Sequence, residues 1–325
     1  MRAYIIRRLM LMVPTLFLLS MLVFLAVRLI PGDIVMAMQA TSISEGEVDR
    51  EAIERLLGLD APIYVQYGRW LGVVPWQGEY QGIFQGNLGV SWWRRETVTT
   101  LLAQSWPVTF ELGFMSIIVS QLIAIPIGIY SAMRQDKPGD YIARSFAIIC
   151  IAVPSFWLGT LVILLPSLWW GYMPPIMYTS FFADPVTNLK MFIVPAIVTG
   201  MALSGISMRM TRTMMLEVLR QDYIRTAWAK GLRERMVITR HALKNALIPV
   251  VTILGIQIPV VIGGTVITET LFQLPGMGRL LINAANNRDL PLISGITIVF
   301  ASALILINLA VDLTYAFLDP RIRYK

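Results

Sequence analysis

Six apolar stretches, each about long enough to cross a membrane as a helix, constrain this chain of 325 residues more than any other feature. They are residues 9–30, 107–133, 145–171, 191–208, 245–268 and 291–311. A helix needs about 20 apolar residues to cross a hydrocarbon core of about 30 Å. Charged residues make up only 14% of the chain, against about 25% in soluble domains. The sequence therefore predicts an all-α polytopic membrane protein with six transmembrane helices and excludes a soluble enzyme.

Basic residues indicate which side of the membrane each connecting segment faces. The segment between the fourth and fifth stretches, from Arg209 to Lys244, contains nine Lys and Arg residues and three acidic ones. Positively charged segments tend to stay in the cytoplasm, so this loop is assigned there. Both termini are then predicted to be cytoplasmic, and most of the 27 Lys and Arg residues lie in segments assigned to that side.

The segment between the first two stretches, residues 31–106, is the one sizeable insert, and the topology places it on the extracytoplasmic side. It carries nine acidic and five basic residues, so the net charge of +7 reflects topology, and no nucleic-acid partner is expected. Residues 47–57 are predicted to form a short amphipathic helix that ends at Gly58. The aromatic residues of the insert favour an interfacial belt or docking surface over a ligand-stacking site. They include Trp70, Trp76, Tyr80, Trp92, Trp93 and Trp106.

The basic loop, residues 210–246, has the pattern of two helices joined at a glycine. Residues 217–230 are mostly good helix formers, and Gly231 is placed to end that helix in a left-handed turn. A second, short helix is predicted from about Arg233 to Ala246. The two helices and their turn would form a rigid unit beneath the membrane.

This loop resembles the EAA loop of permease subunits of ATP-binding-cassette importers, in particular the oligopeptide, dipeptide and nickel type. From Asp222 to Leu247 it matches the peptide-type variant nearly letter for letter, as Asp-Tyr-Ile-Arg-Thr-Ala-x-Ala-Lys-Gly-Leu and later Arg-His-Ala-Leu-x-Asn-Ala-Leu. It departs from the general motif at Arg225, His241 and Lys244, which stand where Glu, Ile and Pro are usual.

The resemblance extends over essentially the whole chain. Further matching phrases lie at residues 57–62, 66–67, 86–91, 268–278, 287–289 and 319–324. They are similar to the first-named, B-type permease of the peptide family, whose insert meets an extracytoplasmic solute-binding protein. The regions implied are a first transmembrane helix (1–30), an extracytoplasmic insert (31–106) and a five-helix permease core (107–325) that contains the coupling loop 210–246.

The resemblance also implies a mechanism and a set of partners. The chain would import short peptides by ATP-driven alternating access in the cytoplasmic (inner) membrane of a prokaryote, with oligosaccharides or chelated nickel as alternative cargoes. Its partners would be a sister permease in a heterodimer, two cassette ATPase subunits, a solute-binding protein and the lipid bilayer. A second copy of this chain in place of the sister permease stays open.

The resemblance assigns ATPase coupling to the first helix of the loop and the turn after it. These residues are Asp222, Tyr223, Arg225, Thr226, Ala227, Ala229, Lys230, Gly231 and Leu232. Ala227 and Gly231 are expected to be small because a groove of the ATPase closes around them.

Polar groups in the spans or at their ends are candidates for the transport pathway, because a polar group in hydrocarbon tends to face protein or a water-filled cavity. They are Glu111, Gln121, Gln257, Glu269, Asn308 and Asp312. For Glu269, a role in the outer gate and a plain interfacial carboxylate both stay open.

Catalytic patterns are missing from the sequence, so no catalytic residue is assigned. It has no G-x-x-x-x-G-K-[ST] phosphate loop, so ATP and Mg are expected in the partner subunits and no cofactor in this chain. The one histidine, His241, has no cluster of ligands near it, so no metal site is expected, and Cys150 is expected to be a buried apolar residue. A secondary transporter, which typically has inverted repeats and mid-span charges, is the alternative class.

Overall fold

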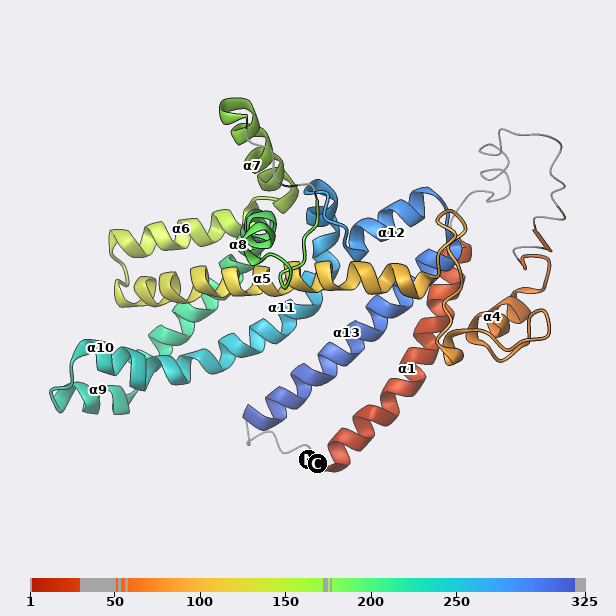
Figure 1. The fold of residues 1–325 in the computed structure, drawn as a ribbon. Helices are drawn as coiled ribbons and strands as arrows, with labels where there is room; N and C mark the ends of the chain where they lie inside the picture. The colour runs from red at the N-terminus through yellow and green to blue at the C-terminus, as the bar shows by residue number, and fades with distance from the viewer. Residues whose placement is uncertain are drawn as a thin grey trace. The chain divides into compact units, whose positions relative to one another are not determined.

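The computed structural model describes residues 2–29, 51, 54–55, 58–171, 175 and 177–318. This part of the chain is helical, with strand-like pairing limited to the isolated bridges Trp76–Glu79 and Val90–Thr97. In chain order the elements are α1 (Arg2–Arg28), α4 (Ile63–Leu71), η1 (Ile83–Gln85), α5 (Val98–Met133), α6 (Pro138–Ala152), α7 (Ser155–Trp170), α8 (Pro185–Leu219), α9 (Asp222–Ala229), α10 (Glu234–Met236), η2 (Val237–Ala242), α11 (Leu243–Leu271), α12 (Met277–Asn286) and α13 (Leu290–Leu318) (Figure 1). The predicted all-α fold is confirmed.

The long helices correspond to the predicted spans. Five described helices are long and apolar enough to cross a membrane, and α6 with α7 makes a sixth if the two count as one bent span. α5 and α8 continue well beyond the apolar stretches that predicted them. The start of α8 is fixed by Asp184, whose carboxylate accepts the backbone N–H groups of Val186 and Thr187.

The third predicted span, residues 145–171, is not one helix. α6 ends at Ala152 and α7 begins at Ser155, and the two helices are bent by 96°. Pro154 has no N–H to continue the helical hydrogen bonds, and its ring disfavours helical backbone at the preceding residue. Val153 accordingly has φ −80° and ψ 120°. The proline pattern predicted kinks, and here it produces a complete break.

Contacts group the chain into two compact units. The first is Met1–Trp106 with Leu280–Ile305, and the second is Pro107–Arg279 with Leu306–Lys325. In the first unit, α4 of the insert packs against α1. The hydroxyls of Tyr67 and Ser20 are 2.8 Å apart, and the Tyr67 ring meets Phe24 edge-on. Most of the predicted helix 47–57 lies outside the described residues.

The insert also holds the start of α13. Asp289, just before α13, is buried and accepts a hydrogen bond from Ser91 Oγ. Trp93 Nε1 donates to the carbonyl of Asn287 at 2.6 Å. At least this tryptophan of the insert therefore has a packing role inside the first unit.

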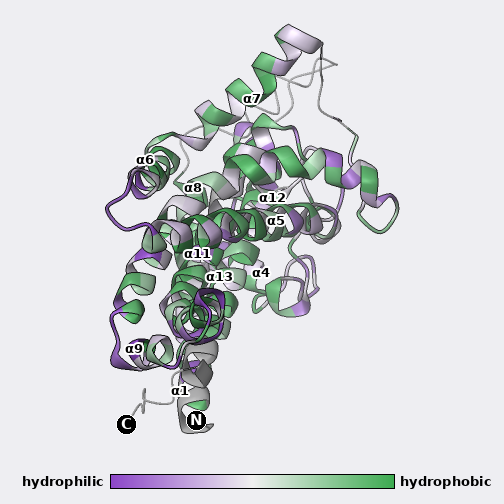
Figure 2. Ribbon diagram, turned by 90° about the vertical axis from the view of Figure 1, so that its left-hand side faces the viewer, coloured by the Kyte–Doolittle hydropathy of each residue, from purple (hydrophilic) through white to green (hydrophobic). Residues whose placement is uncertain are grey.

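In the second unit α8 is the central helix, packed against both α6 and α11. α6 and α8 approach closely at Gly205, where a Cβ would lie 2.6 Å from the carbonyl oxygen of Ala147. A separate apolar cluster forms around Phe192, with Leu112 and Leu274. Hydrophilic residues gather instead at α9 and at the turn before α6 (Figure 2).

Candidate functional site

The loop between α8 and α11 contains a compact element that we call the foot, residues 222–232. α8 ends at Leu219, the chain turns at Arg220 and Gln221, and α9 begins at Asp222. The prediction of one helix over residues 217–230 is therefore wrong. Arg and Gln are both good helix formers, so propensity gave no signal of this break, which the extended conformation of Gln221 (φ −72°, ψ 149°) produces.

Gly231 ends α9 in a left-handed conformation, φ +72°, as predicted. Its N–H donates to the carbonyl of Trp228 at 2.9 Å, and the N–H of Leu232 donates to that of Ala227 at 3.4 Å. This pair of bonds is the Schellman arrangement, which satisfies carbonyl groups at a helix end. A Cβ on Gly231 would meet nothing within 4 Å. The backbone conformation, and not a lack of space within the chain, requires glycine here.

The second helix of the loop is not short, in contrast to the prediction for residues 233–246. α10 leads into the π-helical segment η2, which continues without a break into α11. The wider turns of a π-helix are rare and occur often at functional sites. The predicted second helix and the fifth predicted span thus form one continuous helical rod, and the foot is attached directly to a membrane-spanning helix.

One face of α9 is buried in the core of this chain. Ile224 and Ala227 are 0% and 6% exposed, and they belong to an apolar cluster with Met215 of α8 and Val237 of η2. The sequence interpretation placed Ala227 in contact with a groove of the ATPase. In the structure the small side chain of Ala227 packs among apolar residues of its own chain.

The opposite face of α9 is open to a partner. Its exposed residues, with the turn that follows, are Asp222, Tyr223, Arg225, Thr226, Trp228, Ala229, Lys230 and Gly231, while Leu232 is half-buried. Tyr223 and Trp228 are each 43% exposed, and Tyr223 Oη accepts a hydrogen bond from Asn245 Nδ2 at 2.8 Å. Trp228 stands where the motif allows any residue, so motif matching missed it. A large apolar side chain on a charged helix was the available signal.

Two pathway candidates meet at one hydroxyl group. Gln121 on α5 and Gln257 on α11 both donate from Nε2 to Ser207 Oγ on α8, at 3.2 and 3.1 Å. Gln257 is 5% exposed and donates also to the carbonyl of Leu203 at 3.1 Å. These two amides therefore tie three helices together.

Glu269, near the end of α11, is fully buried and holds the start of α12. Its carboxylate accepts hydrogen bonds from Thr109 Oγ1 at 2.7 Å and from the N–H groups of Gly278 and Arg279 at 2.7 and 3.1 Å. The Thr109 hydroxyl in turn accepts the N–H of Met277 at 2.8 Å. Free N–H groups at a helix start favour a negative charge. Glu269 thus caps the start of α12.

The turn between Glu269 and α12 leaves no room for a side chain at Gly276. A Cβ there would lie 2.3 Å from Glu269 Cδ. The sequence marked Pro275 and Gly276 as a turn. The close approach of the buried carboxylate adds a second reason for the glycine.

The remaining pathway candidates stand apart from these groups. Glu111 is partly buried, and its Oε1 atom has no hydrogen-bond partner within the described residues. Asn308 is exposed on α13, and the side chain of Asp312 lies outside the described residues. No hydrogen bond in the described part of the chain joins Glu111 or Asn308 to the Gln121–Ser207–Gln257 group.

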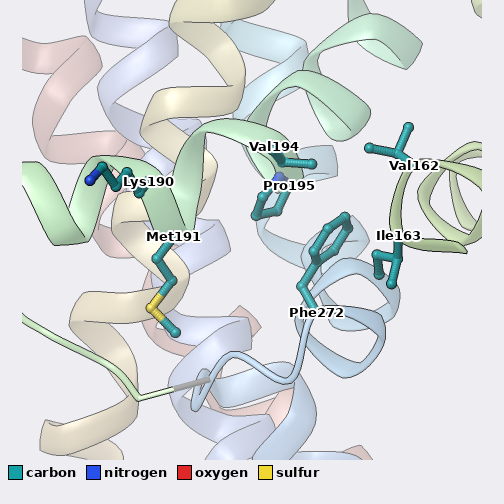
Figure 3. A pocket seen from close by; sticks show the side chains of 7 residues that line it. All are labelled: Val162, Ile163, Lys190, Met191, Val194, Pro195 and Phe272. Carbon is teal, nitrogen blue, oxygen red and sulfur yellow. The ribbon is translucent and has the colours of Figure 1, made fainter. Parts of the chain in front are cut away.

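A narrow apolar crevice lies between α7 and α8 (Figure 3). Its lining residues are Val162, Ile163, Lys190, Met191, Val194, Pro195 and Phe272. The Phe272 ring lies between Pro195 and Ile163, and the Lys190 nitrogen points away from it (Figure 3). None of the pathway candidates whose side chains the structure describes lines this crevice.

The cysteine and histidine lie in separate places. Cys150 is buried in α6, as predicted, and His241 is half-buried in η2. Among the residues that the structure describes, no group of three His, Cys, Asp or Glu side chains could hold a metal ion.

The helical arrangement is similar to that of a solved transporter. The structure described as "Crystal structure of an amino acid ABC transporter with histidines" matches with a TM-score of 0.50 at 16% identity, over 69% of this chain and 95% of its own. At this identity the likeness concerns the fold alone. The fold and the long apolar helices define the class as a multi-pass, all-helical membrane protein.

The chain belongs to the family of binding-protein-dependent transport system inner membrane components, whose profile matches residues 124–324. A second profile, for the N-terminal part of such membrane components, matches residues 1–113. The chain is 39% identical to the oligopeptide transport system permease protein AppB of Bacillus subtilis, over 100% of both chains. It is 37% identical to the dipeptide transport system permease protein DppB of Escherichia coli, over 99% of both.

These matches confirm the resemblance to ABC importer permeases. The chain is a non-catalytic, multi-pass inner membrane component of a transport system that works with a binding protein and ATPase subunits.

Proposed function

We propose that this chain is the B-type half of a peptide importer and that it pairs with a sister permease, so that the pathway forms between the two. Two cassette ATPase subunits, which bind ATP and Mg, would hold the exposed face of α9. Closure of the ATPase dimer would then move the foot and switch the spans between inward-facing and outward-facing states. The observation that supports this most is the foot itself: an exposed aromatic pair, Tyr223 and Trp228, on a helix that is packed rigidly between α8 and α11.

Short peptides are the proposed cargo because relatives that match over nearly their whole length are named for dipeptide and oligopeptide transport. The spans of this chain contain few charged groups, so selection is assigned to the pocket of the binding protein. Oligosaccharides and chelated nickel are the alternatives that the test must exclude.

The test is uptake into proteoliposomes that contain the two permeases and the ATPases. Labelled dipeptides and longer peptides should accumulate only when both ATP and the binding protein are present, and excess oligosaccharide or nickel chelate should not compete. This chain alone should hydrolyse no ATP. Uptake driven by an ion gradient without ATP would identify a secondary transporter and refute the proposal.

Orientation is tested by cysteine labelling in a Cys150→Ala background. We propose that the foot and both termini face the cytoplasm, because the basic residues concentrate there. Arg235 and Glu79 are both exposed. A cysteine at Arg235 should react with an impermeant thiol reagent only in inverted vesicles, and one at Glu79 only in intact spheroplasts. The reverse pattern would overturn the orientation.

Replacing Gln257 with leucine should slow transport without changing which peptide is preferred. The substitution removes donors to Ser207 and to the carbonyl of Leu203, so it loosens the contact between α8 and α11. Interhelical hydrogen bonds in membranes contribute about 0.6 kcal/mol each on average, so we expect a change in rate and not a loss of folding. Gln121→Leu should act similarly, whereas Gln135→Leu, at an exposed site in the turn before α6, is the control. A switch of preference in a competition assay would show that this chain carries its own substrate site.

A further inference from the structure

A buried ion pair joins α6 to α8 in the second unit. Arg212 on α8 donates from Nε to Asp140 Oδ1 at 2.8 Å and from Nη2 to Asp140 Oδ2 at 2.7 Å. Ser131 Oγ on α5 donates to Oδ1 at 2.6 Å, and the N–H of Asp136 donates to Oδ2 at 3.0 Å. The Asp140 side chain is 0% exposed and that of Arg212 is 20% exposed. One carboxylate at the start of α6 thus accepts four hydrogen bonds from α5, α8 and the turn between α5 and α6.

Stability alone gives no reason for this pair. Replacing a buried ion pair by apolar residues of similar volume is often neutral or stabilising, whereas removing only one partner is strongly destabilising. Arg212 donates to both carboxylate oxygens of Asp140, and this bidentate contact fixes the orientation of the two side chains relative to each other. The pair therefore fixes how α6 lies on α8.

The ion pair is connected to the foot along two helices. Ser131, which bonds Asp140, is followed in α5 by Ala132, and Ala132 belongs to the apolar cluster that buries Ile224 and Ala227 of α9. Arg212 lies one turn before Met215 on α8, and Met215 belongs to the same cluster. Packed side chains therefore connect α9 to the ion pair along both α5 and α8.

Beyond the ion pair, α6 follows α8 closely, and α7 does not continue its direction. The backbones of α6 and α8 come together at Gly205 and Ala147, where there is no room for a side chain on the glycine. α6 then ends at the break before Pro154, where α7 departs at 96°. The break at Val153 and Pro154 thus separates α6, which is held along α8, from α7, which runs in its own direction.

We propose that Asp140 and Arg212 are positioning residues that make α6 move as one body with α8 and the foot, while α7 pivots separately at Val153 and Pro154. This inference rests on the proposed function, since the movement is the one that ATPase closure would impose. We expect the pair to affect how much peptide is transported for each ATP hydrolysed.

The first test measures peptide uptake per ATP hydrolysed in the reconstituted complex. The double variant Asp140→Leu with Arg212→Met removes both charges and keeps side chains of similar size. It should retain ATPase activity that responds to the binding protein, but its uptake per ATP should fall at least about fivefold, the lower end of typical coupling between sites. In Arg212→Lys, which keeps the positive charge but cannot bind both carboxylate oxygens as the planar guanidinium does, uptake per ATP should fall less. Arg209→Met, at an exposed position one turn earlier on α8, is the matched control.

The second test uses spin labels with the ion pair intact, so it does not depend on how the double variant folds. Labels at the exposed positions Arg144 on α6 and Glu217 on α8 should keep their separation between the ATP-free and ATP-trapped complexes. Labels at Ser167 on α7 and Glu217 should change theirs. Equal changes in both pairs, or unaltered uptake per ATP in the double variant, would overturn the inference. A wild-type complex without binding-protein-stimulated ATPase would instead refute the proposed function.

Discussion

Replacing Ala227 with aspartate is expected to abolish uptake, because the new carboxylate would lie inside the apolar cluster that holds α9. Ala227 is 6% exposed and packs among Ile224, Met215 and Val237. Burying a polar group without a partner costs at least about 1–3 kcal/mol, and an ionised one costs far more. α9 has only 8 residues, and a helix shorter than about 12 residues is not stable in water without packing. The foot should therefore detach and lose its fixed shape.

The measurement is hydrogen exchange of the backbone amides of residues 222–246, together with co-purification of the ATPase subunits. Exchange should accelerate across this segment in Ala227→Asp, and the ATPases should be lost. Ala229→Asp makes the same chemical change on the exposed face two residues later, and it should leave exchange in the segment unaltered. If Ala227→Asp lost the ATPases while exchange stayed at the wild-type rate, Ala227 would be a contact residue after all.

Glu269→Leu should cause the second large effect, a severe loss of folded protein. The substitution leaves the Thr109 hydroxyl and the N–H groups of Gly278 and Arg279 without their acceptor. Each buried donor left without a partner costs about 1–3 kcal/mol, so three of them approach the whole stability of a typical domain. The measurement is thermal unfolding of the purified complex in detergent. The readout is the fraction of the complex that remains monodisperse as the temperature rises.

A matched pair of glycine substitutions tests the same cap without removing the charge. A Cβ on Gly276 would press against the Glu269 carboxylate, whereas one on Gly263 would meet nothing within 4 Å. Gly276→Ala should therefore lower the unfolding temperature clearly and Gly263→Ala should not. Equal behaviour of the two variants would mean that the turn before α12 is looser than the structure indicates.

The sequence predicted the membrane-spanning helices because their signal is local: a run of apolar residues has few alternatives in a bilayer. It failed where a single backbone conformation decides the outcome. Val153 before Pro154 turns a kink into a break, and the extended Gln221 separates α8 from α9 although its neighbours favour helix. The apolar pattern does not indicate that η2 joins α10 to α11, so the sequence predicts a second loop helix that is too short.

For the polar groups in the spans, the sequence likewise identified some residues but not the residues that contact them. Gln121, Gln257 and Glu269 could be identified because polar groups are unusual in apolar spans. Their partners could not, because the contacts join residues far apart in the chain: Thr109 is 160 residues from Glu269, and Arg212 is 72 residues from Asp140. Ser207 and Thr109 carry no charge and belong to no motif, so only the packing of the helices identifies them.

The break between α6 and α7 has a consequence for how the two helices lie in the membrane. α6 has 15 residues and α7 has 16. At about 1.5 Å per residue each rises only about 22–24 Å, less than a hydrocarbon core of about 30 Å. Neither helix alone can match the thickness of the bilayer, and because the two are bent by 96° they cannot both run along the membrane normal. We expect the exposed rings of Trp169 and Trp170 at the end of α7 to lie at the lipid–water boundary, which such rings favour.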